Sequence, residues 1–190
     1  MKKIDENEKK ILKELVRNPR QSDNQLAKRT GIPLKTVNRK RKLMEKHGIL
    51  NYITWVDNGP SGTGEFSLPQ MFIVKLQHGI TRKKLTESLL GSNFTETDIK
   101  HTVISYVGEI DGHVCLIIVY ASRQDTDILE IFNAELVPKL KGLLGQDCIH
   151  SVQSIQLTTP ISLMHNYLPL VNMENGTIRQ SWPGHLIYVG

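Results

Sequence analysis

The apolar positions in the first fifty residues recur at helical spacing and predict short helices. The first helix begins at the capping pair Asp5 and Glu8, in which a side-chain acceptor is followed three residues later by an acid, and it ends before Pro19. The second begins at Ser22 and ends at Gly31, because glycine adopts the left-handed conformation of a helix end at little cost.

A third helix is predicted over residues 33–47, and Gly48 ends it. Three short helices with a tight glycine turn before the third predict a helix-turn-helix. Residues 49–57 are rich in β-forming side chains and predict a short wing with an exit strand. We therefore expect a winged helix-turn-helix domain at residues 1–57, followed by a linker at residues 58–69, which begin with a Gly- and Ser-rich run.

From residue 70 onward the apolar pattern indicates strands as well as helices. The expected elements are a strand, a helix, two strands, a helix and a strand, at residues 71–76, 81–90, 99–110, 113–121, 125–144 and 152–161. This βαββαβ order is ferredoxin-like, and we place the domain at residues 70–162. The fold class is therefore α+β, with an N-terminal winged helix-turn-helix and a C-terminal ferredoxin-like domain that carries a C-terminal extension.

The C-terminal extension comprises residues 163–190. Glu174-Asn175-Gly176 is a turn signal between apolar stretches, and residues 186–189 are again apolar. These features predict an added β-hairpin or a swapped arm.

Two expected strands of the second domain are unusually apolar. Residues 114–120 are apolar on both faces, and residues 71–74 nearly so. In the ferredoxin-like order these strands are central, and the two helices cover only one face of the sheet. The other face most simply meets the same face of a second copy, so we expect a homodimer, with a tetramer or octamer left open.

The charge of the chain is unevenly distributed. Residues 1–50 hold 15 Lys and Arg against 6 Asp and Glu, whereas the remaining residues hold 9 against 13. A basic module on a mildly acidic one is typical of a polyanion-binding domain joined to a different body. Charge alone leaves DNA, RNA and anionic lipid open.

The third helix carries the strongest functional signal. Lys35, Asn38, Arg39 and Lys42 lie at i, i+3, i+4 and i+7, which makes one continuous face. The face could simply be solvated, but solvated helices normally alternate charges, and Glu45 is the one acid between positions 33 and 47. We therefore favour DNA binding, with Lys35, Asn38 and Arg39 reading bases and Lys40 and Lys42 contacting phosphate. The full set of expected DNA-contacting residues is Lys35, Thr36, Asn38, Arg39, Lys40 and Lys42.

Composition excludes several other classes of protein. No apolar run reaches the roughly 20 residues that cross a bilayer, and the first residues have no signal-peptide core, so we expect no membrane association. Cys115 and Cys148 make no disulfide framework, which fits a reducing cytoplasm. Cys148 and His150 lack a partner pair at zinc-site spacing. Because no nucleophile, phosphate-loop or paired-carboxylate motif occurs, we expect no catalytic residue, metal or cofactor.

Four runs of the sequence occur in the order found in one family of regulators. They read Ile4-Asp5-Glu6-Asn7-Glu8-Lys9-Lys10-Ile11-Leu12, Gly31-Ile32-Pro33-Leu34-Lys35-Thr36-Val37-Asn38-Arg39-Lys40, Glu45-Lys46-His47-Gly48-Ile49-Leu50 and Val107-Gly108-Glu109-Ile110-Asp111. Together they resemble the Lrp/AsnC (feast/famine) family over about residues 4–162. The resemblance implies a transcription regulator that binds double-stranded DNA, with a regulatory second domain. Arg41 is a departure, because the family usually has a buried aliphatic residue there, so the third helix is expected to pack differently.

The resemblance also implies an amino-acid effector, bound between neighbouring dimers near the hairpin turn. The corresponding residues here are Gly108, Glu109, Asp111 and Gly112. Gly108 would let backbone amides approach a carboxylate, and Asp111 could accept an ammonium group. The alternative is structural, since Asp-Gly is also a favoured type I′ turn whatever its function.

Two other functions stay open. Siroheme decarboxylases share this two-part architecture and use His and Arg around a tetrapyrrole, which would be visible as a Soret-type absorbance band. A low-specificity architectural protein would bind matched and mismatched DNA alike at fixed salt. The basic face of the third helix favours the regulator over the decarboxylase, because a decarboxylase has no use for it.

Overall fold

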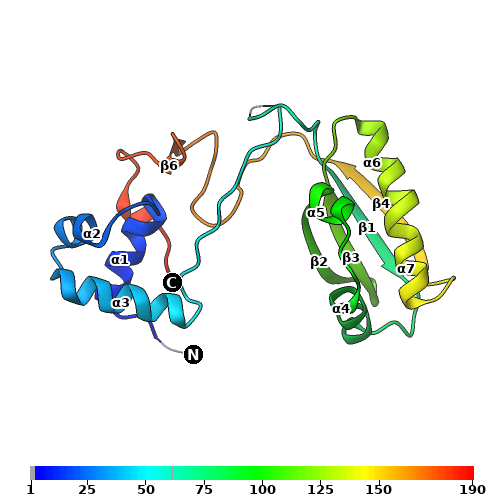
Figure 1. Cartoon of the computed structure of the whole chain (residues 1–190), viewed down its shortest axis with the longest axis horizontal. Helices are drawn as coiled ribbons and strands as arrows, with labels where there is room; N and C mark the ends of the chain where they lie inside the picture. Colours follow the sequence, from blue (N-terminus) through cyan, green and yellow to red (C-terminus); the bar gives the residue numbers. More distant parts are fainter. Residues whose placement is uncertain (1–2, 61) are drawn as a thin grey trace. The chain divides into compact units, whose positions relative to one another are not determined.

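A computed structural model describes residues 3–60 and 62–190 of the chain (Figure 1). Residues 1 and 2 of the expected first domain and Ser61 of the expected linker lie outside the described residues. The chain falls into two compact units. We name Met1–Trp55 together with Thr159–Gly190 the helical unit, and Val56–Thr158 the sheet unit. The segment that follows the last strand of the sheet therefore belongs with the N-terminal helices.

The helical unit contains the three expected helices, α1 (Glu6–Arg17), α2 (Asp23–Thr30) and α3 (Leu34–Lys46). Both capping pairs form: the side chain of Asp5 accepts from the backbone of Glu8, and that of Ser22 accepts from the backbone of Gln25. In each box the N3 side chain also accepts from the cap's backbone N–H, so donors that a helix start leaves free are satisfied.

The core of the helical unit joins all three helices. Its members are fully or almost fully buried: Ile11, Leu12, Leu15, Leu26, Ile32, Val37 and Met44. Because each helix contributes one apolar stripe, burial of these stripes fixes which face of α3 points inward and which stays outside.

The strand expected over residues 49–57 is not formed. Among the described residues, no strand lies between the end of α3 and Gln70. Side chains here are largely exposed, and Ile53 is 76% and Trp55 55% accessible. A strand needs a hydrogen-bonding neighbour, and no described segment pairs with this one, so its β-forming residues alone do not make a strand.

The sheet unit has the expected βαββαβ order. Its strands are β1 (Gln70–Leu76), β2 (Thr102–Ile110), β3 (His113–Tyr120) and β4 (Ile149–Gln156), and its helices are α4 (Arg82–Gly91), α5 (Glu96–His101), α6 (Asp125–Ile131) and α7 (Val137–Leu144). The sheet is antiparallel in the order β2-β3-β1-β4, so β1 and β3 are central and the ferredoxin-like fold is confirmed. One π-helical turn, η1 (Phe132–Leu136), joins α6 to α7 and completes the long helix expected over residues 125–144.

Two boundaries of the sheet unit differ from the sequence prediction. The expected strand 99–110 begins only at Thr102, because the capping box of Thr95 and Asp98 starts the short helix α5 before it. The expected strand 152–161 lies instead at residues 149–156. The neighbouring strand β1 sets the limits of β4, because β4 pairs along the whole of β1, from Gln70 with Gln156 to Leu76 with Ile149.

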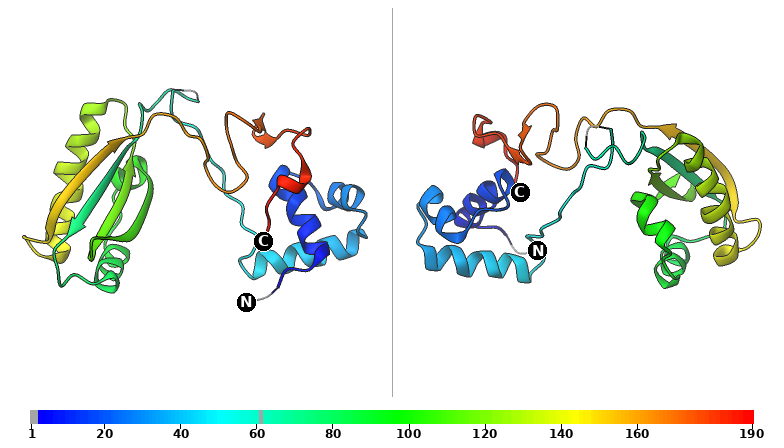
Figure 2. Two further views of the ribbon diagram at one scale, coloured as in Figure 1. Left: turned by 180° about the vertical axis from the view of Figure 1, so that it is seen from behind. Right: turned by 45° about the horizontal axis from the view of Figure 1, so that its top comes forward.

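The core of the sheet unit lies between one face of the sheet and the helices (Figures 1 and 2). Phe72 of β1 stacks on Phe132 with ring centroids 4.2 Å apart, and Tyr120 of β3 packs edge-on against Phe72. The register places alternate residues of the strands on the opposite face, where Ile73 lies beside Ile117. No described helix is long and apolar enough to cross a membrane.

The C-terminal segment of the helical unit contains the hairpin indicated by the turn signal. Its strands are β5 (Met173–Glu174) and β6 (Thr177–Ile178), and a 3₁₀ turn, η2 (Gly184–Leu186), follows. Asn175 and Gly176 have φ of +50° and +74°, the two positive values that a type I′ turn requires.

Two glycines three residues apart near the end of α7 allow a matched test of the fold. Gly142 lies within the helix with open space around its Cα, whereas Gly145 has φ +113° and ψ 154°, a conformation nearly restricted to glycine. We expect Gly142→Ala to raise the free energy of unfolding by about 0.5–1 kcal/mol. Gly145→Ala should lower it by about 1–3 kcal/mol. Urea unfolding followed by circular dichroism checks both, and equal shifts for the two variants would contradict the structure.

Candidate nucleic-acid interface

The outer face of α3 carries an exposed basic row. Lys35, Arg39, Lys42 and Lys46 follow one another at i, i+4, i+7 and i+11, and all four are exposed. Val37 and Met44 point to the other side and are fully buried. Among the described residues, no carboxylate forms an ion pair with Lys35, Arg39 or Lys42. These cations are therefore free to meet an anion outside the chain, and half-buried Thr36 lies next to the row.

Asn38, a second expected base-reading residue, has a partner within the chain. Its side-chain amide donates to Oδ2 of Asp23 at 2.7 Å. Arg41 donates to the other oxygen, Oδ1, at 3.1 Å and to the backbone oxygen of Gln21 at 3.0 Å. The start of α2 is thus bound to α3 through both carboxylate oxygens of one residue.

Arg41 occupies the position where a buried aliphatic residue would be usual for the resembling family. Its Nε donates to the hydroxyl of Tyr52 at 2.8 Å and lies 3.2 Å from Glu45, while its guanidinium stacks 5.3 Å from the ring centroid of Tyr52. Burial disfavours the charge of Arg41, but the bonds to Tyr52 and Asp23 outweigh burial and raise the pKa of the guanidinium. Burial, followed by the bond to Glu45, raises the pKa of Tyr52. The charged side chain of Arg41 is therefore fixed between Asp23 and Tyr52.

Lys40 lies apart from the exposed row. Its side chain is only 11% accessible and pairs with Asp5, with Glu8 3.7 Å away. The bond from Lys40, followed by the backbone bond of Glu8, lowers the pKa of Asp5. Lys40 thus joins α3 to the first turn of α1, a partner that lies 35 residues away in the sequence.

The hairpin proposed for an effector has the geometry of a type I′ turn. Asp111 and Gly112 have φ of +47° and +77°. The carboxylate of Asp111, 77% accessible, lies 3.1 Å from Lys75, and Glu109 lies 2.5 Å from Arg82. Turn geometry explains Asp111-Gly112 without a ligand, although the exposed carboxylates remain within reach of one.

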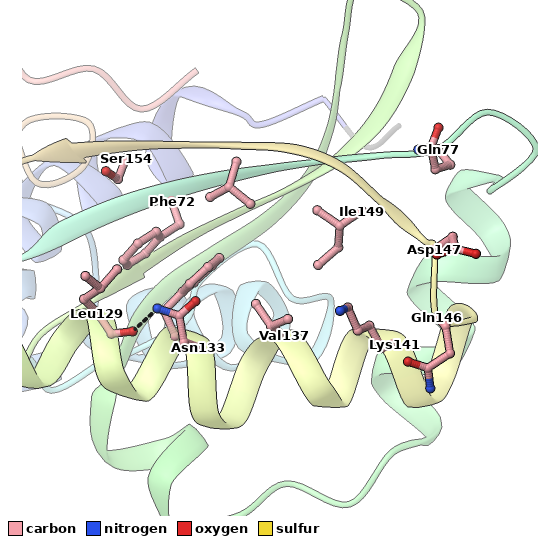
Figure 3. A pocket seen from close by; sticks show the side chains of 12 residues that line it. Phe72, Gln77, Leu129, Asn133, Val137, Lys141, Gln146, Asp147, Ile149 and Ser154 are labelled. Atoms are coloured by element: carbon pink, nitrogen blue, oxygen red, sulfur yellow. Dashed lines mark hydrogen bonds between the residues drawn. The ribbon is translucent and has the colours of Figure 1, made fainter.

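A groove of the sheet unit was not indicated by the sequence. It has a volume of about 570 Å³ and runs between β4 and the long helix (Figure 3). Its lining includes the apolar side chains of Phe72, Phe132 and Val137. Lys141 and Asp147 lie toward one end (Figure 3). The groove arises from the spacing between a helix and an edge strand, which no local pattern of residues encodes.

Three histidines of the sheet unit have partners in the chain. Nδ1 of His101 donates to the carbonyl of Ala121 at 2.9 Å, and that of His113 donates to Leu76 at 2.7 Å. His150 stacks on His113. In the part of the chain that the structure describes, no group of three or more His, Cys, Asp or Glu is arranged to hold a metal ion.

Comparison with known proteins agrees with this geometry. Residues 4–51 match the family described as winged helix-turn-helix DNA-binding. No curated protein matches the chain at a significant level.

Solved structures match most of the chain. An AsnC family transcriptional regulator from Agrobacterium tumefaciens is 20% identical, with a TM-score of 0.63 over 87% of this chain and 97% of that one. AsnC of E. coli is 21% identical, with a TM-score of 0.58 over 86% and 97%. A transcriptional regulator from Neisseria meningitidis, solved as a complex with L-Met, is 18% identical, with a TM-score of 0.61 over 89% and 98%. The resemblance noted from the motifs is thus confirmed for the fold: the chain carries a winged helix-turn-helix domain and, over most of its length, has the fold of AsnC/Lrp-type transcription regulators.

Proposed function

We propose that the chain is a sequence-specific DNA-binding transcription regulator that acts as a dimer or larger assembly, without catalysis, in the cytoplasm. The observation that carries the proposal is the unpaired basic row on the outer face of α3 in a helix-turn-helix. In this motif the third helix enters the major groove, where side chains reach base edges. Unpaired cations there lose no internal partner when they bind phosphates or bases.

The proposed contacts follow from which side chains are free. Arg39 and Lys35 read base edges and Lys42 contacts phosphate, since all three are exposed and unpaired. Thr36 borders the same surface. Asn38 reads a base only by exchanging its bond to Asp23 for one to DNA. We leave Lys40 out of the proposed contacts because it is held against α1.

The proposed dimer uses the sheet face opposite the helices. The register puts an apolar set on this face, namely Met71, Ile73, Ile104, Tyr106, Ile117 and Ile155. Tyr106 is 60% and Ile155 49% exposed in the single chain. A two-fold axis through this face would give two copies of α3 and a pseudo-palindromic operator, with half-sites one or more helical turns apart.

The proposed effector is an amino acid or a similar small molecule. One similar structure was solved as a complex with L-Met, and the motif resemblance implies an amino-acid ligand near Gly108, Glu109, Asp111 and Gly112. Its ammonium group would compete with Lys75 and Arg82 for the carboxylates of Asp111 and Glu109.

Removing the arginine of the row tests base reading. We expect Arg39→Ala to cost about 1–3 kcal/mol of binding free energy and to relax base preference at one position, because a bidentate contact is lost. Fluorescence anisotropy with a selected operator measures both. Arg20→Ala, at an exposed arginine of the same unit outside α3, is the matched control and should leave affinity unchanged. An Arg39→Ala chain that binds as tightly as the parent would refute the assignment.

Two neighbouring lysines separate phosphate contact from internal pairing. We expect Lys42→Ala to weaken binding to all sequences alike and to reduce the salt slope of log K by about one unit. Lys40→Ala should leave that slope unchanged, because its charge is already used by Asp5. Affinity is measured over a range of salt concentrations. The reverse pattern would place Lys40, not Lys42, on DNA.

The dimer is tested by mass in solution. Light scattering at micromolar concentration should give at least twice the 21.6 kDa of the chain. Tyr106→Glu places a charge on the apolar face and should yield monomers, because a buried unpaired carboxylate is costly. Leu129→Glu, at a position of similar exposure on the long helix, should leave the dimer intact. A monomeric parent chain would overturn the proposed dimer.

Calorimetry with L-Met and other amino acids tests the effector hairpin. We expect the parent to bind a ligand and Asp111→Asn to bind it more weakly, since Asn keeps the turn preference but removes the charge. Asp147→Asn, in the groove, is the matched control. Equal binding by parent and Asp111→Asn would make Asp111 a turn residue only, and loss of binding in Asp147→Asn would move the site to the groove.

A further inference from the structure

Arg17, the last residue of α1, makes contacts that a surface arginine would not. It is only 8% accessible. Its guanidinium donates to three backbone oxygens of the C-terminal segment, those of Arg179 at 2.9 Å, Gln180 at 3.2 Å and Trp182 at 2.9 Å. Among the described residues no carboxylate lies within ion-pair distance of it. A buried charge is tolerated when it is fully hydrogen-bonded, and here the C-terminal segment supplies those bonds.

Apolar contacts accompany this clamp. Ile178 and Ile187 of the segment are 1% and 2% accessible, and Val189 packs against the core of the three helices. The hydroxyl of Tyr167 donates to the backbone oxygen of Val16 at 3.2 Å. Burial of two isoleucine side chains is itself favourable, so the segment is held by more than its hydrogen bonds.

The C-terminal segment also has a folded interior of its own. Asn172 is fully buried, and its side chain bonds the backbone of Asn166 at 2.8 Å and of Leu168 at 3.1 Å. Its backbone oxygen accepts from Arg179 at 2.9 Å. The segment that offers its carbonyls to Arg17 is therefore held by hydrogen bonds of its own that do not involve α1.

The two ends of the sheet unit lie side by side, so the sheet unit can be inserted between the helices and the C-terminal segment without separating them. Gln70, which begins β1, pairs with Gln156, which ends β4, and the backbone of Leu157 donates to Pro69 at 2.8 Å. A domain whose ends are adjacent can be inserted into another with little effect on the host. The chain thus leaves the helical unit after residue 55 and returns to it at residue 159.

We propose that residues 159–190 complete the DNA-binding unit and that Arg17 fastens them to α1. Within the helical unit α1 lies between β6 and α3 (Figures 1 and 2). The segment supports α1, against which α3 packs, and leaves the row free. The helix-turn-helix is consequently joined to the sheet unit by two connections instead of one. The expected effect of this segment on DNA binding rests on the proposed function, whereas its expected effect on the stability of the helices does not.

The test uses full-length variants and two independent readouts. Arg17→Gln removes the clamp from the helix side, and Ile187→Ser removes burial from the segment side without touching a helix. The matched controls are Arg20→Gln, whose exposed side chain makes one bond to the segment at 3.4 Å, and Leu186→Ser, whose side chain is 51% accessible. Hydrogen exchange of the amides of α1 is the first readout, and affinity for a selected operator is the second.

We expect Arg17→Gln and Ile187→Ser to speed exchange in α1 by about tenfold or more and to weaken DNA binding, while both controls resemble the parent. The dimer mass should stay unchanged in all four variants, since the sheet unit is not altered. Should Arg17→Gln fail to fold, Ile187→Ser decides alone. Exchange in α1 at the parent rate in Ile187→Ser would overturn the inference. Faster exchange in the two variants, together with a parent chain that itself binds no operator, would refute the proposed function only.

Discussion

The carboxylate of Asp23 links the second and third helices of the DNA-binding unit through both of its oxygens, to Asn38 and to Arg41. The link acts together with the apolar core in positioning α3, because ridge-into-groove packing of helices still allows a scatter of about 15–20° in crossing angle. Pairing also divides the charges of α3 into two groups. Arg41 and Lys40 are held inside the unit, whereas Lys35, Arg39 and Lys42 are left outside, with no carboxylate partner among the described residues. The surface offered to DNA is what remains after internal pairing.

Local rules explain how far the sequence predicts the fold. The capping boxes at Asp5 and Ser22 formed as expected, since each depends on residues three apart. The order of the sheet followed from alternation and from the Asp111-Gly112 turn. The strand predicted at residues 49–57 was wrong, because strand formation needs a pairing partner that the composition of these residues does not supply. The end of β4 was shifted for the same reason, since β1 determined its length.

The site was predictable only where it depends on one helix. The exposed row at Lys35, Arg39 and Lys42 follows from helical periodicity alone. The pairing of Lys40 with Asp5 joins residues 35 apart, and the clamp of Arg17 reaches residues more than 160 away. Arg17 in the sequence is an ordinary basic residue at a helix end, where a cation is favourable in any case. Long-range partners of this kind are set by tertiary packing, so no spacing rule reveals them.

The central claim is that a helix-turn-helix with an unpaired basic face reads a specific sequence as a dimer. Selection of bound DNA from a random pool, at fixed salt and with and without amino acids, tests this claim most directly. The account predicts enrichment of a pseudo-palindrome whose half-sites lie one or more helical turns apart. A pool that is retained without any enriched sequence would contradict it and would indicate binding through phosphates alone.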